Sequence, residues 1–520
     1  MPMMPAMKSY RCDLSRLLKG ISDVPAALNA QIHGIQSDSQ KIKKGDLFIA
    51  LSGARGDALR FVPDAIARGA SAVLIENDNL SYDFESSAHE EGRAVELYVA
   101  NLKASVGEIA HRFFAKPSEE LFVVGITGTN GKTSVSNYLA QFENFNGLKA
   151  GVIGTLGYGL IGEGDALIET HHTTPDVVEL HRYFAHLRDA GAQVAAVEVS
   201  SHGLAQQRVA GVRFDAAIFT NLSRDHLDYH GDMQSYLSAK AQLFMIPSLR
   251  FVVLNADDPA SEVLAADIAP DVSIVRYSVK STLTNAKVSV GGFTLGSGVR
   301  AKLKISLDQS SVAELELQSS LLGEFNLSNL LSVAAYAIAK GYDVGALKAL
   351  SQIQAVAGRM ERFMAASGTQ LVVDYAHTPA ALENVLATLS QLVEGKLSVV
   401  FGCGGDRDKG KRPLMAEVAE RYADQIIVTD DNPRTEDPEE IVKDIIKGFS
   451  SEHHYQLCRD RKQAISQAFC SAQEKDIILV AGKGHEDYQE VNGHRHYFSD
   501  AEVCRELIAL PRRSQDGLFA

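Results

Sequence analysis

Residues 121–142 constrain the fold of this chain more than any other stretch does. They read LFVVGITGTNGKTSVSNYLAQF, which predicts a buried strand, a glycine-rich turn from Gly128 to Gly131, and a helix with an apolar stripe. Backbone N–H groups of such a turn, at the start of a helix, point toward an anion. Lys132 would add a positive charge beside a terminal phosphate, and the Thr133 hydroxyl is suited to hold Mg²⁺.

The spacing within this turn differs from that of the general phosphate-binding loop. Gly128 and Gly131 enclose two residues, whereas the common pattern encloses about four. The alternative interpretation is an ordinary strand-to-helix turn followed by a surface lysine. Because the strand, both glycines, the Lys-Thr pair and the helix occur together, we predict a nucleotide site here.

Length and composition limit what surrounds this site. With 520 residues the chain is too long for one core, so about two to four domains are expected. The formal net charge is −14 and no basic patch is visible, so we expect no nucleic-acid partner. The five cysteines are scattered without CxxC spacing, which indicates reduced thiols in a cytoplasmic protein. No signal peptide is recognisable, and no run approaches the roughly 18 apolar residues of a membrane span, so we expect no membrane insertion.

The first hundred or so residues predict a small α/β unit. Residues 47–51 and 71–75 read as strands on either side of a helix. Two polar, turn-rich stretches at 35–46 and 52–61 flank the first strand, and they are interpreted either as solvated loops or as a binding surface. Residues 117–120, with the sequence PSEE, predict a linker into the nucleotide-binding strand.

Strands alternate with helices from residue 121 to about residue 354, which predicts a mainly parallel sheet with crossover helices. In such sheets ligands gather beyond the carboxyl ends of the strands. Two apolar strands end in polar clusters that contain Glu198 and His226. Glu198 is therefore a candidate Mg²⁺ ligand, whereas His226 is either a metal contact or a loop histidine bonded to its neighbours. Residues 280–320 read as short antiparallel strands.

Lys240 lies in the apolar stripe of a predicted helix, on the face shared by Tyr236, Leu237, Leu243 and Phe244. Such a lysine snorkels to solvent, forms an ion pair or loses its proton, because burial lowers a lysine pKa by about 3–5 units. A neutral amine can react with CO₂ to give a carbamate, an anion able to ligate Mg²⁺. From the residues alone, the snorkelling lysine is the favoured interpretation.

Two helix starts carry polar residues. A long helix is predicted to begin near Asn326 and Asn329, whose amides would either reach a nucleotide or cap the helix. In the sequence TEDPEE, Asp437 is predicted to be the N-cap of another helix and Pro438 its first residue.

The pattern of strands and helices restarts after residue 355 as a doubly wound, Rossmann-like unit. Its strands each end in a polar loop, at 374–377, 404–411, 430–434 and 482–486. Four loops rich in Gly, Arg and Asp on one sheet edge indicate a binding site.

Nine motifs along the chain resemble those of the Mur ligase family, and the resemblance covers essentially the whole chain. In order they read GTNGKT, HTTPD, EVSSHGL, TNLSRDHLDYHGD, AGRME, DYAHTP, GCGGDRDKGKRP, TDDNPRTEDP and AGKGHEDYQ. The first is a short nucleotide loop that the family shares with folylpolyglutamate synthetase. The resemblance implies an α/β protein of three domains: a UDP-sugar-binding domain at 1–118, a P-loop ATP-binding domain at 119–355 and a Rossmann-like amino-acid-binding domain at 356–520.

The resemblance also implies roles for residues around the nucleotide. Lys132, Glu198, His226 and Lys240 would be catalytic. Thr133 with Glu198 would hold one Mg²⁺, and His226 with a carbamylated Lys240 (N6-carboxylysine) would hold a second, which replaces the snorkelling interpretation. ATP would contact the turn, the three residues that follow it and three residues further along the chain, namely Gly128, Thr129, Asn130, Gly131, Lys132, Thr133, Ser134, Asn326, Arg359 and Asp374.

Two further sets of residues are implied for the other substrates. The UDP-sugar peptide would contact Ser37, Ser39, Ala54, Arg55 and Gly56 in the first domain and Thr173, Thr174, Ser200, Gln206 and Arg208 in the second. The added amino acid would contact Arg407, Asp431, Asn432, Pro433, Arg434, Gly482 and Glu486. One departure is that the usual DSR of the nucleotide-sugar loop is Asp38-Ser39-Gln40 here.

The sequence DNPR resembles the signature of family members that add meso-diaminopimelate, since lysine-adding members lack the arginine. The Arg434 guanidinium offers a planar fork of donors for the distal carboxylate of that amino acid. The resemblance therefore implies a monomeric, Mg²⁺- and ATP-dependent ligase of peptidoglycan precursor synthesis. It would add meso-2,6-diaminopimelate to the D-glutamate γ-carboxylate of UDP-MurNAc-L-Ala-D-Glu through an acyl phosphate. The alternatives are a ligase that adds lysine or polyglutamate, and a P-loop switch that uses ATP for conformational work.

Overall fold

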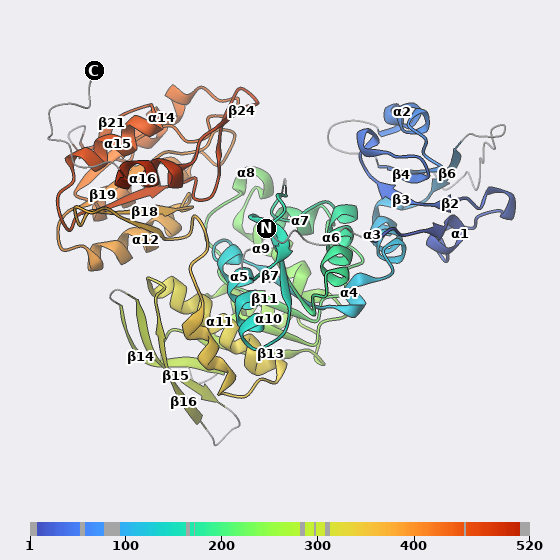
Figure 1. Cartoon of the computed structure of the whole chain (residues 1–520), viewed down its shortest axis with the longest axis horizontal. Helices are drawn as coiled ribbons and strands as arrows, with labels where there is room; N and C mark the ends of the chain where they lie inside the picture. The colour runs from blue at the N-terminus through green and yellow to red at the C-terminus, as the bar shows by residue number, and fades with distance from the viewer. Residues whose placement is uncertain are drawn as a thin grey trace.

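The computed structural model describes residues 8–51, 58–76, 94–162, 167–170, 172–280, 287–295, 298–306, 312–451 and 454–509. Figure 1 shows three α/β domains in chain order, with the N-terminal domain in blue and the C-terminal domain in orange and red on either side of the middle one. Each domain is built around its own sheet, and the predicted three-domain α/β fold is confirmed. Over the described ranges, no helix combines the length and apolar character needed to cross a membrane.

The N-terminal domain contains a four-stranded parallel sheet. Its strands, in spatial order, are β3 (Gly34–Gln36), β4 (Asp46–Ala50), β5 (Ala72–Glu76) and β6 (Val95–Val99). The predicted strands 47–51 and 71–75 correspond to β4 and β5, each displaced by one residue. The remaining elements are an antiparallel pair, β1 (Cys12–Asp13) and β2 (Gln31–Ile32), and the helices α1 (Leu14–Leu17), α2 (Val62–Ala67) and α3 (Leu102–Phe113).

The middle domain is organised around a ten-stranded sheet. In spatial order its strands are β16 (Val312–Ser319), β15 (Val299–Ser306), β14 (Val288–Leu295), β13 (Ser273–Ser278), β12 (Phe251–Asn255), β11 (Ala216–Phe219), β7 (Phe122–Thr127), β10 (Val194–Glu198), β8 (Ala150–Gly154) and β9 (Gly157–Leu160). The strands from β13 to β8 are parallel, as predicted. The strands expected within 280–320 are antiparallel to one another, and they extend the main sheet because β14 pairs with β13.

Strand β7 lies inside this sheet, and both of its faces are buried. Val124 and Ile126 belong to one hydrophobic core and Val123 belongs to the other. A strand covered on both sides reads as a continuous apolar run rather than an alternation, which is why the stretch before the glycine-rich turn has no polar residue until Thr127.

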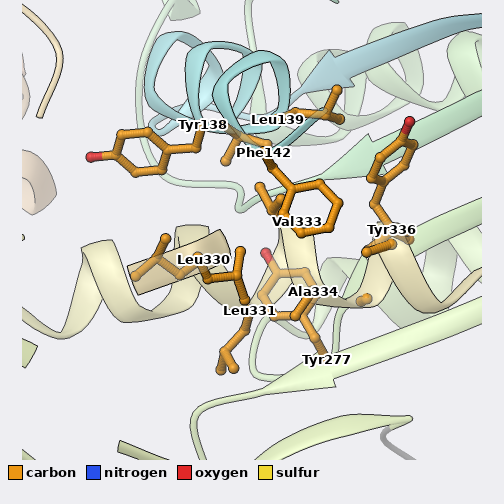
Figure 2. Close-up of a cluster of buried hydrophobic side chains, with 14 of the residues drawn as sticks. Tyr138, Leu139, Phe142, Tyr277, Leu330, Leu331, Val333, Ala334 and Tyr336 are labelled. Carbon is orange, nitrogen blue, oxygen red and sulfur yellow. The ribbon is translucent and has the colours of Figure 1, made fainter. Parts of the chain in front are cut away.

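The first of these cores is closed by helices α5 (Lys132–Phe145) and α11 (Glu324–Lys340). Figure 2 shows Tyr138 and Phe142 of α5 facing Leu330 and Val333 of α11 across the cluster, with Tyr277 of β13 beneath them. This packing fixes the start of α5, and with it the glycine-rich turn. The other helices of the domain are α4 (Pro117–Glu120), α6 (Val177–Asp189), α7 (Ser201–Ala205), α8 (Leu227–His230), α9 (Met233–Ala241) and α10 (Ala260–Ala266).

Two local predictions in this domain are wrong. The expected linker at 117–120 is the one-turn helix α4, in which the Ser118 hydroxyl is buried and accepts a hydrogen bond of 3.0 Å from the Arg213 backbone N–H. The capping interpretation of Asn326 and Asn329 also fails, because α11 begins at Glu324 and its N-cap is Gly323, without a side-chain cap.

The C-terminal domain is the doubly wound unit predicted from the sequence. Its sheet, in spatial order, contains β17 (Glu361–Met364), β18 (Gln370–Asp374), β22 (Ile477–Ala481), β19 (Leu397–Phe401), β20 (Gln425–Val428) and β21 (Gln456–Leu457), all parallel except β17. The helices are α12 (Pro379–Leu392), α13 (Lys411–Tyr422), α14 (Pro438–Ile446), α15 (Arg461–Ser471) and α16 (Asp500–Ala509), and the hairpin is β23 (Tyr488–Val491) with β24 (His494–Tyr497). The predicted start of α14 is confirmed, since the Asp437 carboxylate accepts from the Glu439 N–H at 2.9 Å.

Candidate active site

The glycine-rich turn has the shape that phosphate binding requires. Gly128 and Gly131 have φ angles of 150° and 88°, which favour glycine. A Cβ at Gly128 would lie 1.9 Å from the Thr220 hydroxyl, so no side chain fits there. The Lys132 ammonium donates to the carbonyls of Gly128 and Thr129, each at 2.9 Å, and burial lowers the pKa of Lys132.

A cavity of about 570 Å³ lies over this turn, and both the middle and the C-terminal domain contribute to its wall. Arg359 reaches across, since its guanidinium donates to the Thr133 hydroxyl at 3.2 Å. The buried Asp374 is part of this wall and accepts from the backbone N–H groups of Met360 and Ala376, each at 2.8 Å. Burial raises the pKa of Asp374, although Arg359 opposes the shift. The predicted nucleotide residues that line the cavity are Thr129, Asn130, Gly131, Lys132, Thr133, Ser134, Arg359 and Asp374.

Asn326 differs from these residues because it lies behind the lining. Its amide donates to the Leu322 carbonyl at 2.8 Å and accepts from the Tyr138 hydroxyl at 3.0 Å. Asn329, one turn further along α11, lines the cavity. The sequence placed both asparagines on the same helix start but gave no means to tell which one faces the cavity.

Glu198 lies at the carboxyl end of β10 beside the turn. Its buried carboxylate accepts hydrogen bonds from the Thr133 hydroxyl at 2.9 Å, the Thr155 N–H at 2.9 Å and the Thr155 hydroxyl at 3.0 Å. A carboxylate and a hydroxyl side by side are hard oxygen donors of the kind that Mg²⁺ prefers. These residues therefore fit the predicted Mg²⁺ site. Thr155 is a member of this cluster that sequence reasoning missed.

Lys240 is 1% exposed, so the snorkelling interpretation is wrong. Its amine donates to the Gly128 carbonyl at 2.9 Å and lies 4.3 Å from the centre of the Tyr236 ring. Burial, together with the charge of Lys132, lowers the pKa of Lys240 well below its ordinary value. A lowered pKa favours the neutral amine, which is the form that reacts with CO₂ to give a carbamate.

His226 is the N-cap residue of helix α8 and has a left-handed conformation, with φ of 56°. Its ring Nε2 lies 3.4 Å from the Asp225 carboxylate, which is the neighbour contact foreseen as one of its two interpretations. In the described portions of the chain no three His, Cys, Asp or Glu residues form a group that would hold a metal ion. Ions at Thr133–Glu198 or at His226–Lys240 would therefore take their remaining ligands from phosphate, water or a modified lysine.

The residues predicted for the sugar peptide in the middle domain form one hydrogen-bonded cluster next to Glu198. The Thr174 hydroxyl donates to the Glu198 carbonyl at 2.8 Å and accepts from the Ser200 N–H at 2.9 Å. The Arg208 guanidinium donates to the Thr174 carbonyl at 2.7 Å and to the Gln206 side chain at 2.7 and 3.0 Å. The Thr173 hydroxyl lies 3.0 Å from the Thr155 hydroxyl, within hydrogen-bond distance, and Thr173 lines the nucleotide cavity.

Of the residues predicted to contact the UDP-sugar peptide in the N-terminal domain, Ser37 and Ser39 lie within the described ranges. The Ser37 hydroxyl donates to Asp176, at the start of α6, at 3.5 Å, so this loop reaches the middle domain. Ser39 is buried beside Asp38, whose carboxylate accepts from the Gln40 N–H at 2.9 Å. Ala54, Arg55 and Gly56 lie outside the described residues.

The amino-acid loops of the C-terminal domain converge on a buried lysine that sequence reasoning missed. Lys483 lies inside the motif AGKGHEDYQ, and its ammonium contacts the Asn432 side-chain oxygen at 3.1 Å and Glu486 at 3.3 Å. The Asn432 amide in turn donates to Glu486 at 2.8 Å. Burial raises the pKa of Glu486, while Lys483 opposes that shift. A Cβ at Gly482 would lie 2.6 Å from the Asp431 carboxylate, so the loops are closely fitted.

Arg407 and Arg434 complete the predicted set. Arg407 donates to the Asp406 carbonyl at 3.0 Å, and Arg434 donates to the Gly405 carbonyl at 2.8 Å. Pro433 is buried between Asn432 and Arg434. The loops after β19, β20 and β22 therefore meet, as the positions of their polar residues predicted.

The middle and C-terminal domains are also joined by charges near the phosphate-binding turn. Arg224 pairs with Asp408 at 3.1 Å, and Asp225 lies 3.8 Å from both Lys411 and His377. Burial disfavours ionisation of Asp225, but attraction to His226, Lys411 and His377 outweighs it and lowers the pKa. None of Arg224, Asp225 and Lys411 was predicted as a site residue, although each lies inside a quoted motif.

Models of three Mur ligase domains match this chain. The Mur ligase family catalytic domain matches residues 31–114, the Mur ligase middle domain matches 126–337, and the Mur ligase glutamate ligase domain matches 358–484. The chain belongs to the Mur ligase family.

Similar proteins cover nearly its whole length. A UDP-N-acetylmuramoyl-L-alanyl-D-glutamate--2,6-diaminopimelate ligase from Ectopseudomonas mendocina (strain ymp) is 47% identical over 479 residues, which cover 92% of this chain and 95% of that protein. A solved structure of a protein with the same name is 35% identical with a TM-score of 0.65, and covers 97% of this chain and 99% of that one. MurF from Acinetobacter baumannii, at 16% identity and a TM-score of 0.66 over 96% of this chain and 99% of that one, shares the fold.

Proposed function

We propose that this chain is an ATP-dependent ligase that joins meso-2,6-diaminopimelate to the D-glutamate γ-carboxylate of UDP-MurNAc-L-Ala-D-Glu. The observation that carries the proposal is the nucleotide cavity, whose wall comes from both the phosphate-binding turn and the C-terminal domain that holds the amino-acid loops. The relatives that are similar over nearly the whole chain bear the name of this activity.

The chemistry follows from the poor reactivity of a carboxylate. The γ-carboxylate oxygen attacks the ATP γ-phosphorus, ADP leaves, and an acyl phosphate forms. The amine of the amino acid then attacks the acyl carbon and loses a proton, while inorganic phosphate leaves as the amide bond forms. The first step brings two anions together, so the protein has to supply positive charge.

Residues around the turn are suited to that task. The half-buried Lys132 ammonium lies beside the turn that would receive the phosphates, and Arg359 approaches from the C-terminal domain. Mg²⁺ held by Thr133 and Glu198, and a second ion at His226 and a carbamylated Lys240, would neutralise the transferring phosphoryl group. Glu198 also orders the peptide site, since its carbonyl accepts from Thr174.

The remaining assignments belong to the same proposal. The UDP-sugar peptide lies between the domain at 1–118 and the domain at 119–355, and the amino acid lies on the domain at 356–520. The enzyme acts as a monomer in the cytoplasm, in peptidoglycan precursor synthesis. The residues that would bind each substrate are those predicted above, with Asn329 in place of Asn326 at the nucleotide.

Product analysis tests this function directly. Purified protein is incubated with ATP, Mg²⁺, UDP-MurNAc-L-Ala-D-Glu and either meso-diaminopimelate or lysine, and the product is weighed by mass spectrometry. We expect an amide product with diaminopimelate and phosphate release that depends on it. ATP hydrolysis at the same rate without any amino acid would instead identify a P-loop switch.

A further inference from the structure

The hairpin formed by β23 and β24 has a half-buried strand, an exposed strand and a tight turn between them. Its strands pair antiparallel with Val491 opposite His494, which leaves Asn492 and Gly493 as a two-residue loop. Both loop residues have positive φ, 49° and 76°, as a turn of this kind requires. In Figure 1 the label β24 marks this hairpin at the edge of the C-terminal domain.

The inner strand of the hairpin grips the loop 431–434 through its backbone and one side chain. The Gln489 amide donates to the Asp431 carbonyl at 2.7 Å, and the Glu490 N–H donates to the Asn432 side-chain oxygen at 2.9 Å. The Arg434 N–H donates to the Glu490 carbonyl at 3.0 Å, and the Asn492 N–H donates to the Arg434 carbonyl at 2.6 Å. Arg434 and Val491 thus form a parallel bridge outside the named strands.

Arg434 depends on these bonds for its conformation. It is left-handed, with φ of 53°, which is unfavourable for a residue other than glycine. Its guanidinium donates to the Gly405 carbonyl at 2.8 Å and lies 3.9 Å from the Glu490 carboxylate. A Cβ at Gly404 would lie 2.8 Å from the same guanidinium, so the fork occupies a closely fitted position.

We propose that the β23–β24 hairpin is the specificity clamp of the amino-acid site: it holds Arg434 in a strained backbone conformation that aims the guanidinium at the distal group of the added amino acid. Gln489 and Asn492 are positioning residues in this clamp. The inference rests on the proposed function, because it concerns how that function selects its amino acid. A guanidinium fork recognises a carboxylate only in the right orientation, so loosening the clamp lowers the preference for diaminopimelate over lysine.

Two substitutions at the turn form a matched pair. Asn492→Val places a β-branched residue at φ of 49°, where it is strained, whereas Asn492→Gly accepts that conformation. We expect Asn492→Val to raise the KM for diaminopimelate by about tenfold, and to lower the ratio of kcat/KM for diaminopimelate over lysine by about the same factor. This is the effect of losing one good hydrogen bond, here the one between the Arg434 guanidinium and the distal carboxylate. Asn492→Gly should stay close to the unmodified enzyme, and the KM for ATP should not change in either variant.

A second pair tests the side-chain contact without touching the turn. Gln489 and His496 face each other across the hairpin, and His496 is exposed. Gln489→Leu removes the donor to Asp431 and should raise the KM for diaminopimelate roughly 5- to 10-fold, whereas His496→Leu should not. Thermal unfolding of all four variants identifies any that do not fold. If an Asn492 variant does not fold, the comparison of Gln489→Leu with His496→Leu tests the clamp instead.

The outcomes separate this inference from the proposed function. Equal selectivity of Asn492→Val and Asn492→Gly, or of Gln489→Leu and His496→Leu, in an enzyme that uses diaminopimelate would overturn the clamp. A larger KM for ATP alongside that for the amino acid would also overturn it, since it would indicate a general structural role. Absence of any diaminopimelate product with the unmodified chain would instead refute the proposed function.

Discussion

The phosphate-binding turn and the amino-acid loop are held in shape by different means. The turn follows the central strand β7, and its left-handed positions are the glycines Gly128 and Gly131. The loop follows β20, and its left-handed residue is Arg434, which is bonded to a hairpin further along the chain. The turn is therefore specified by contiguous sequence, whereas the loop takes its conformation from a distant segment.

The largest effect is expected at the turn itself. Lys132→Met removes the half-buried ammonium that donates to the two turn carbonyls, and kcat should fall roughly 10²–10³-fold because one charge-stabilising group is lost. Steady-state kinetics measure this, with Lys103→Met as an exposed lysine control. A kcat for Lys132→Met within a few-fold of the unmodified value would contradict a catalytic role of the phosphate-binding turn.

Lys240 should come next. Lys240→Ala should lower activity by about 10²-fold, on the scale of one lost electrostatic contact, and a small carboxylate or CO₂ should partly restore it. Lys240→Arg is the informative control, because it keeps a cation but cannot form a carbamate. Full activity of Lys240→Ala would exclude a carbamate role, and full activity of Lys240→Arg would show that a positive charge suffices.

A substitution of Arg434 tests the amino-acid loop. Arg434→Ala should reduce the preference for diaminopimelate over lysine by about 10- to 150-fold, which corresponds to the roughly 1.5–3 kcal/mol of a charged hydrogen bond. The KM for ATP should remain unchanged, because Arg434 does not line the nucleotide cavity. Competition between the two amino acids, read by product mass, measures the ratio. An unchanged ratio would remove Arg434 from recognition.

The smallest effect is expected at the contact between the middle domain, which carries the phosphate-binding turn, and the C-terminal domain, which carries the amino-acid loop. The Arg224–Asp408 pair spans the middle and C-terminal domains, but Arg224 is 48% exposed, so solvent screens it. A double-mutant cycle with Arg224→Ala and Asp408→Ala should give a coupling of about 0.2–1 kcal/mol in kcat/KM for ATP. A coupling of several kcal/mol would mean that this contact controls assembly of the cavity.

Much of the nucleotide half was predictable because its signals are local. The apolar run of β7, the glycines and the helix start are adjacent in sequence, and the structure places them as expected. The motifs also predicted the three domains, and the polar loops that end successive strands predicted that these loops meet at one edge of the C-terminal domain's sheet.

The rest depended on contacts between distant segments. Periodicity placed Lys240 on an apolar face, but only the packing of Tyr236 and the turn carbonyl above it distinguishes burial from snorkelling. Lys483 and Asp225 lie in quoted motifs, yet their partners come from other loops. The hairpin also holds the loop that contains Arg434, for example by the hydrogen bond from the Glu490 N–H to the Asn432 side chain. These two residues are 58 positions apart in the sequence, so no local pattern encodes the contact.

The position of β7 has a consequence for local opening of the protein. It is paired on both edges and covered on both faces, so its amides should exchange with deuterium only through the rarest, most global openings. The exposed strand β24 should exchange among the fastest. The nucleotide would then bind next to the strand whose amides exchange most slowly. The amino acid would be recognised next to a strand whose amides exchange among the fastest.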